Sequence, residues 1–104
     1  MSSYRFHQLK GVAGSREVYL NGKKLSPARS QQIRNHSPDG FSWGYGGSGP
    51  AQLALAVMLE LAANEQEALS RYQDFKFEVI AKLPVDRGFE VYIIETPPEA
   101  DKSP

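Results

Sequence analysis

The sequence contains no cysteine and only two histidines. The absence of cysteine excludes a disulfide framework, a thiolate metal site and a thiol nucleophile. His7 and His36 lie far apart and have no carboxylate cluster beside them, so we expect no metal site. Ser37 and Asp39 do lie near His36, but neighbours in sequence do not make a catalytic triad. We therefore expect a protein that is not an enzyme and that holds no cofactor.

A long apolar run is also absent. The most apolar stretch, residues 53–63, is interrupted by Glu60 and is far shorter than the roughly 20 residues that a membrane helix needs. The first ten residues lack the apolar core of a signal peptide. With the lack of cysteine, these features favour a cytoplasmic location.

The net charge is zero, but the charges are segregated along the chain. Residues 1–49 carry seven bases against two acids, and residues 50–104 carry ten acids against five bases. One stretch without acids contains five basic side chains: Lys23, Lys24, Arg29, Arg34 and His36. Phosphate contacts need several cations on one surface, so this stretch is a candidate nucleic-acid site. Alternatively, the two halves of the chain attract each other within one fold.

Hydrophobic periodicity predicts several short strands. Residues 4–9 alternate, which predicts a first strand whose inner face is mostly aromatic, with Tyr4 and Phe6. Residues 17–20 predict a second strand, and Asn21-Gly22 is a strong hairpin signal before a short strand at 23–25. Further strands are expected at 41–43 and, most clearly, at 89–95, and a short helical turn at 27–32.

Two helices are expected between these strands. Pro50 suits the first residue of a helix that is apolar almost all round and therefore belongs in the middle of the domain. Asn64 and Glu67 have capping-box spacing and predict a second helix, running to about Leu83, whose apolar stripe faces the first. Lys76 in this helix is expected at the surface, paired with Asp74 or Glu78.

These elements predict one α+β domain over residues 1–95. It would be an antiparallel sheet of about four to five short strands with a two-helix hairpin packed on one face. Residues 96–104 form a Pro-rich acidic segment that we expect to be disordered.

The segment GYGGSG at 44–49 has the G-x-G-x-x-G spacing of a dinucleotide-binding loop. That motif needs a buried strand before it and a βαβ unit around it, whereas here a helix is followed by another helix. A weaker hypothesis stays open, in which glycine N–H groups before a helix bind an anion or a small nucleotide. Alternatively, the glycines only allow close packing.

The residues around this loop are the candidate binding site. Trp43 and Tyr45 could stack on a base or anchor a protein partner, or they could pack in the core. Gln52 could contact a ligand or could satisfy backbone groups of the loop. The candidate set is Trp43, Tyr45, Gly46, Gly47, Ser48 and Gln52.

Three motifs carry a family resemblance: SPDGFSWGY at 37–45, GSGPAQLAL at 47–55 and YQDFK at 72–76. In these motifs the chain resembles a small domain-of-unknown-function family found in bacteria, archaea, phages and plasmids. The resemblance covers about residues 16–93, and it departs from the family where Gly88-Phe89 replaces a tryptophan. It implies a recurring fold and a habitat in mobile elements, and no chemistry.

The sequence thus favours an interaction module that binds a protein partner through the glycine-rich aromatic loop. Inhibition of a host defence system would fit this size and habitat. A nucleic-acid-binding accessory protein, using the basic stretch, and a nucleotide or anion binder are the alternatives. The open edges of a small sheet also make a homodimer plausible.

Overall fold

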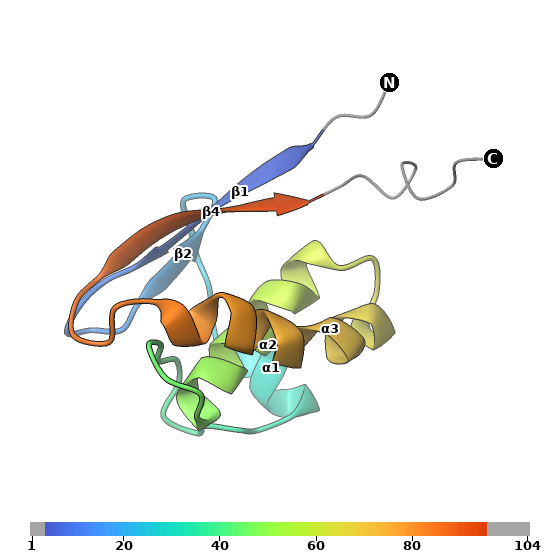
Figure 1. Ribbon diagram of the computed structural model, residues 1–104. Helices are drawn as coiled ribbons and strands as arrows, with labels where there is room; N and C mark the ends of the chain where they lie inside the picture. The colour runs from blue at the N-terminus through green and yellow to red at the C-terminus, as the bar shows by residue number, and fades with distance from the viewer. Residues whose placement is uncertain (1–3, 96–104) are drawn as a thin grey trace.

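The computed structural model describes residues 4–95, which form a sheet with helices packed on one side (Figure 1). The strands are β1 (Arg5–Gly11), β2 (Val18–Leu20), β3 (Lys23–Lys24) and β4 (Phe89–Glu95). The helices are α1 (Ala28–Ile33), α2 (Ser48–Leu61) and α3 (Glu65–Glu78), followed by the 3-10 turn η1 (Ile80–Lys82). The fold is α+β, as predicted. The segment expected to be disordered, 96–104, lies outside the described residues.

The four strands form one antiparallel sheet in the order β3-β2-β1-β4. β1 pairs with β4 along its whole length, from Arg5 opposite Glu95 to Gly11 opposite Phe89. Asn21 and Gly22 join β2 to β3, both with positive φ (55° and 81°). Such a turn matches the twist of a two-residue hairpin, so the hairpin prediction is confirmed.

The prediction of an aromatic inner face on β1 is wrong. Leu9 is buried against the helices, whereas Phe6 lies on the opposite face, which no helix covers. The reason lies at Gly11, which is on the same face of β1 as Leu9. A Cβ atom at Gly11 would lie only 2.2 Å from the Phe89 ring. The phenyl group of Phe89 thus needs the glycine on the inner face, and this fixes which way every other β1 side chain points.

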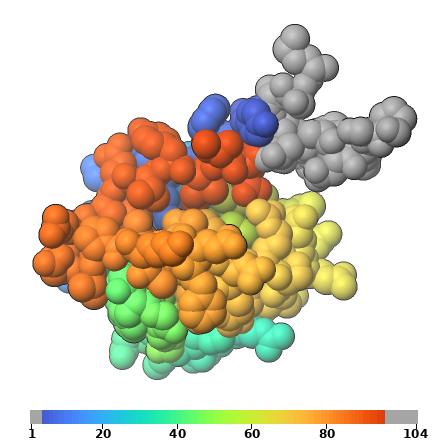
Figure 2. Space-filling model, in the orientation of Figure 1, coloured from blue at the N-terminus to red at the C-terminus, as the bar shows by residue number. Residues whose placement is uncertain are grey.

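Helix α2 is the centre of the domain, as its composition predicts. Residues 49–59 are all buried, because α1, α3 and the sheet surround the helix. Figure 2 shows α3 in front, with the strands above it. The helix begins at Ser48, so Pro50 is its third residue and not its first. That position also tolerates proline, because the first-turn N–H groups have no partner within the helix.

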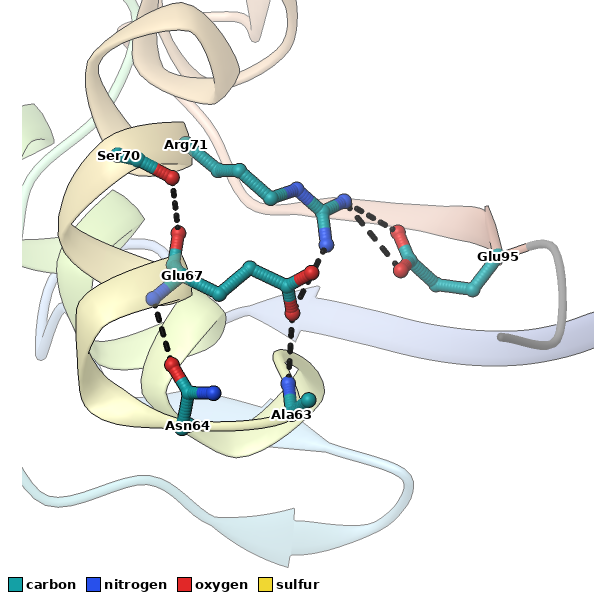
Figure 3. Close-up of polar contacts among 6 residues, drawn as sticks. All are labelled: Ala63, Asn64, Glu67, Ser70, Arg71 and Glu95. Carbon is teal, nitrogen blue, oxygen red and sulfur yellow. Dashed lines mark hydrogen bonds and ion pairs between the residues drawn. The ribbon is translucent and has the colours of Figure 1, made fainter. Parts of the chain in front are cut away.

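The start of α3 is held by side chains (Figure 3). Asn64 Oδ1 accepts from the N–H of Glu67 at 2.8 Å, as the capping-box spacing predicts. The Glu67 carboxylate reaches back to the N–H of Ala63 at 2.7 Å. Arg71, one turn later, donates to both carboxylate oxygens of Glu95 at 3.0 and 3.3 Å, which ties α3 to the end of β4.

One predicted strand does not form, and the predicted end of the second helix is wrong. Residues 41–43 form no strand, because the N–H of Gly44 bonds to the carbonyl of Ile80 in η1 and no strand lies alongside. The second helix ends at Glu78 and not near Leu83. Val79 leaves the helical conformation (φ −122°, ψ −61°), and the chain tightens into η1, whose Ile80 carbonyl is the one that Gly44 uses.

Candidate functional site

Trp43 anchors the segment that leads into the glycine loop. Its ring is fully buried, and its Nε1–H donates to the carbonyl of Arg87 at 3.0 Å. The Phe89 ring meets it edge-on at a centroid distance of 4.8 Å, and the Arg16 guanidinium lies 4.4 Å from its centroid. Trp43 is therefore a core residue that fixes the loop, and a partner docking on the surface does not touch it directly.

Two glycines of the loop are needed where they stand. Gly44 has a φ of +89°, and a Cβ there would lie 2.5 Å from the backbone of Val85. Gly49, in the first turn of α2, lies against Ser42, where a Cβ would meet the Ser42 side chain at 2.6 Å. The first approach places the loop against the segment after η1, and the second places the start of α2 against residue 42. The packing reading of the glycines thus has direct geometric support.

The loop carries an exposed apolar surface, which we call the loop patch: Tyr45, Phe77 and Val85. They are 46%, 56% and 49% exposed, respectively. Phe77 of α3 lies beside Gly46, and Val85 lies beside Gly44, so they flank the loop that carries Tyr45. Figure 2 shows the green loop at the surface, below the orange segment that follows α3. Of the candidate residues, Tyr45, Gly46 and Ser48 are exposed and Gly47 is half-buried.

Lys76 lies under this patch, contrary to the prediction of a surface ion pair. Its side chain is only 7% exposed, and no carboxylate within the described part of the chain lies within ion-pair distance of it. The ammonium group lies 4.0 Å from the Phe77 ring centroid, and its hydrogen bond to the carbonyl of Gly46 is long, at 3.4 Å. Lys76 therefore joins α3 to the loop.

Gln52 is fully buried and makes four hydrogen bonds, which use its whole capacity. Its Oε1 accepts from the N–H groups of His36 and Ser37 at 2.7 and 2.9 Å. Its Nε2 donates to Ser30 Oγ at 2.8 Å and to the Arg34 carbonyl at 3.0 Å. Gln52 thus fixes the chain after α1 against α2. It satisfies backbone groups, but those of residues 34–37 and not those of the glycine loop, as had been predicted.

His36 lies between this network and α3. Its Nε2 is 2.8 Å from the hydroxyl of Tyr72, whose ring is buried. Burial lowers the pKa of His36, and the nearby charges of Lys76 and Arg34 lower it further. The imidazole is thereby favoured in its neutral form. These contacts give His36 a structural role at the joint between α1 and α3.

The basic residues of the candidate nucleic-acid site are only partly brought together. Lys23, Lys24 and Arg29 line one surface hollow of about 370 Å³. Lys24 pairs with Glu17 at 3.1 Å, and Arg29 lies 3.8 Å from Glu60. The Lys24 ammonium also lowers the pKa of the Glu17 carboxyl. Arg34 and His36 lie at the other end of α1 and outside this hollow.

Sequence reasoning did not identify Phe77 and Val85 as surface residues. The sequence contains a signal for the exposure of Phe77 but none for that of Val85. Phe77 falls between the stripe positions Phe75 and Val79, so it points away from the face that packs on α2. Val85 follows Pro84 in a segment without periodicity, and only the fold brings it to the loop.

Within residues 4–95, no helix has both the length and the apolar character needed to cross a membrane. In the same residues, no three histidine or acidic side chains gather where they could hold a metal ion.

Comparison with protein-family models finds one match: the model of a family of unknown function, DUF6166, matches residues 6–96. The chain belongs to this family. Comparison with curated proteins and with solved structures finds no match. The match to DUF6166 spans both halves of the chain and includes almost all of β1 and the whole of β4. It extends further at each end than the resemblance based on the sequence motifs.

Proposed function

We propose that the protein is a non-enzymatic interaction module that binds a protein partner through the loop patch. The observation that carries this proposal is the exposure of three apolar side chains at the loop: Tyr45 on the loop itself, and Phe77 and Val85 beside its glycines. Aromatic side chains on a rigid support contribute strongly to protein interfaces, because little conformational freedom is lost on binding.

Three contacts attach the loop to the rest of the domain. Trp43 fixes the loop from below, the Gly44 N–H fixes it to η1, and Lys76 contacts its carbonyl side at Gly46. The family resemblance adds the finer hypothesis of an origin in mobile elements, where a host-defence protein would be a fitting partner. A second copy of this chain is a candidate partner for the edge of the sheet, which is separate from the loop patch.

The test compares the captured proteins of matched variants. The double substitution Tyr45→Ser and Phe77→Ser removes two of the three exposed apolar side chains. Gln66→Ser changes an exposed residue in the first turn of α3, whereas Phe77 lies in its last turn. Each purified protein is used as bait in a lysate of a host cell, and captured proteins are quantified. We expect a protein retained by the wild type and by Gln66→Ser but lost with the double variant. Equal capture by all three proteins would contradict the proposal.

Nucleic-acid binding is the second candidate, because Lys23, Lys24 and Arg29 share one hollow. Their ion pairs with Glu17 and Glu60 weaken this candidate, since those carboxylates compete with phosphate. If the candidate is correct, changing Lys23, Lys24, Arg29 and Arg34 to glutamine flattens the salt dependence of binding to duplex DNA. An unchanged slope removes it.

A further inference from the structure

The two edges of the sheet differ in how they are protected from other strands. β3 is only two residues long and consists of Lys23 and Lys24, both exposed. Short, charged edge strands of this kind discourage pairing with another chain. β4 has seven residues, pairs with β1 without a bulge, and contains neither lysine nor proline. Among the described residues, nothing pairs with its other edge.

The hydrogen bonds of β1 show which backbone groups of β4 are free. Gln8 turns both of its backbone groups toward the β2–β3 hairpin, where its N–H donates to Asn21 Oδ1 at 2.9 Å and its carbonyl accepts from the N–H of Asn21 at 2.8 Å. Opposite Gln8 in β4 stands Tyr92. Backbone direction alternates along antiparallel strands, so the N–H and carbonyl of Tyr92 point away from β1. The same holds for Glu90 and Ile94.

One end of the uncovered face beside this edge carries apolar side chains. Tyr92 and Ile94 are 61% and 59% exposed, and Phe6, directly opposite Ile94, is 64% exposed. With Tyr4 they form what we call the sheet patch. In Figure 2 the red side chains of β4 lie at the surface beside the blue side chains of β1, with the helices below. The open edge therefore lies beside an exposed apolar patch.

A second copy of β4 fits this edge in one register. Only residues with outward backbone groups can form hydrogen-bonded pairs, and the register with Tyr92 opposite Tyr92 uses all three of them in each copy. It places Glu90 opposite Ile94 of the second copy and, on the inner face, Val91 opposite Ile93. A two-fold axis at Glu90 would instead oppose two carboxylates, which is unfavourable. Hydrogen bonding and charge thus select the same arrangement.

We propose that two copies of the chain associate through antiparallel pairing of their β4 edges, with the two-fold axis at Tyr92, to form one continuous eight-stranded sheet. The surface is separate from the loop patch, so this inference does not rest on the proposed function. Because a two-fold interface contains each contact twice, a single substitution changes two pairs.

A charge pair at position 94 tests the register. Ile94→Glu would set a carboxylate opposite Glu90 of the second copy, whereas Ile94→Lys would set an ammonium there. Both substitutions remove the same apolar side chain, which is exposed in the single copy, and their folding is checked by thermal unfolding. We expect the dissociation constant of Ile94→Glu, from sedimentation over a concentration series, to exceed that of Ile94→Lys by about tenfold.

Amide hydrogen exchange tests the same edge in the unmodified protein. The N–H groups of Tyr92 and Ile94 should become slower to exchange as the protein concentration rises, whereas those of Val91 and Ile93, which point toward β1, should not change. Sedimentation of the wild type should show a mass moving from 11.5 kDa toward twice that value. A wild type that stays at 11.5 kDa, or equal dissociation constants for the two variants, would overturn the proposal.

Discussion

A single buried amide, that of Gln52, holds the first residues after α1 against α2. We expect Gln52→Leu to lower the free energy of unfolding by about 3–5 kcal/mol, because the N–H groups of His36 and Ser37 and the Arg34 carbonyl lose their partner. Urea unfolding measures the change. Gln73→Leu makes the same chemical change on an exposed part of α3 and should have little effect. Equal losses for the two variants would contradict the role of the network.

The imidazole of His36 makes stability depend on pH. Its pKa in the folded state is lowered from 6.5, chiefly by burial. Below 6.5 the unfolded chain therefore binds the proton before the folded chain does, and the free energy of unfolding falls as pH falls. Above that pH this contribution is fully present. Urea unfolding at a series of pH values from about 8 to about 5 measures this decline in the free energy of unfolding.

His36→Gln should flatten the decline, and His7→Gln, at a histidine near the exposed Asn21, provides the matched control. A decline that persists unchanged in His36→Gln would assign the pH dependence to other groups.

Gln52 and Lys76 show what a sequence reveals about a single residue. Gln52 is a polar residue near the start of an otherwise apolar helix, so a role in satisfying backbone groups was predictable. That these groups belong to residues 34–37 and not to the glycine loop was not. Lys76 was misjudged from its neighbours Asp74 and Glu78, yet residues two apart on a helix do not face each other. Its better signal is its position four residues after Tyr72, which places it on the buried stripe of α3.

At the scale of the element, the start of α3 depends on side chains more than on helix propensity. We expect Asn64→Ala to lower the free energy of unfolding by about 1 kcal/mol, because Asn64 Oδ1 no longer accepts from the N–H of Glu67. Thermal or urea unfolding measures the loss. Gln66→Ala changes an exposed residue in the same turn and should be nearly neutral. A neutral Asn64→Ala would show that solvent replaces the cap at no cost.

Among the elements, those with a strong local signal were predictable and those set by a neighbour were not. The central helix, the Asn21-Gly22 hairpin and β4 all follow from residue type and spacing. The segment 41–43 has the alternation of a strand, with Phe41 and Trp43 both buried, but it finds no partner strand. Its place is set by the bond from Gly44 to η1, a contact that no local pattern encodes.

On the scale of the whole molecule, the α+β class and the helical hairpin on one face were predictable from the order of elements. Which side chains of β1 point toward the helices was not predictable, because this depends on Phe89, at the far end of the chain, packing over Gly11. The candidate site was found only in part, since Tyr45 lies in the motif but Phe77 and Val85 reach it through the fold. Surface patches join residues that are distant in sequence, and periodicity reports only neighbours.

The pairing of β1 with β4 also bears on how the chain folds. Gln8 and Glu90, whose side chains bond across these strands, are 82 residues apart in the sequence. Contacts over such distances form slowly, because the closure of a long loop must precede them. During synthesis β1 therefore stays unpaired along the edge that β4 later occupies, until β4 has left the ribosome. A nascent chain stalled before residue 89 would keep β1 available to any other strand, and this interval is when the protein is most exposed to misassembly.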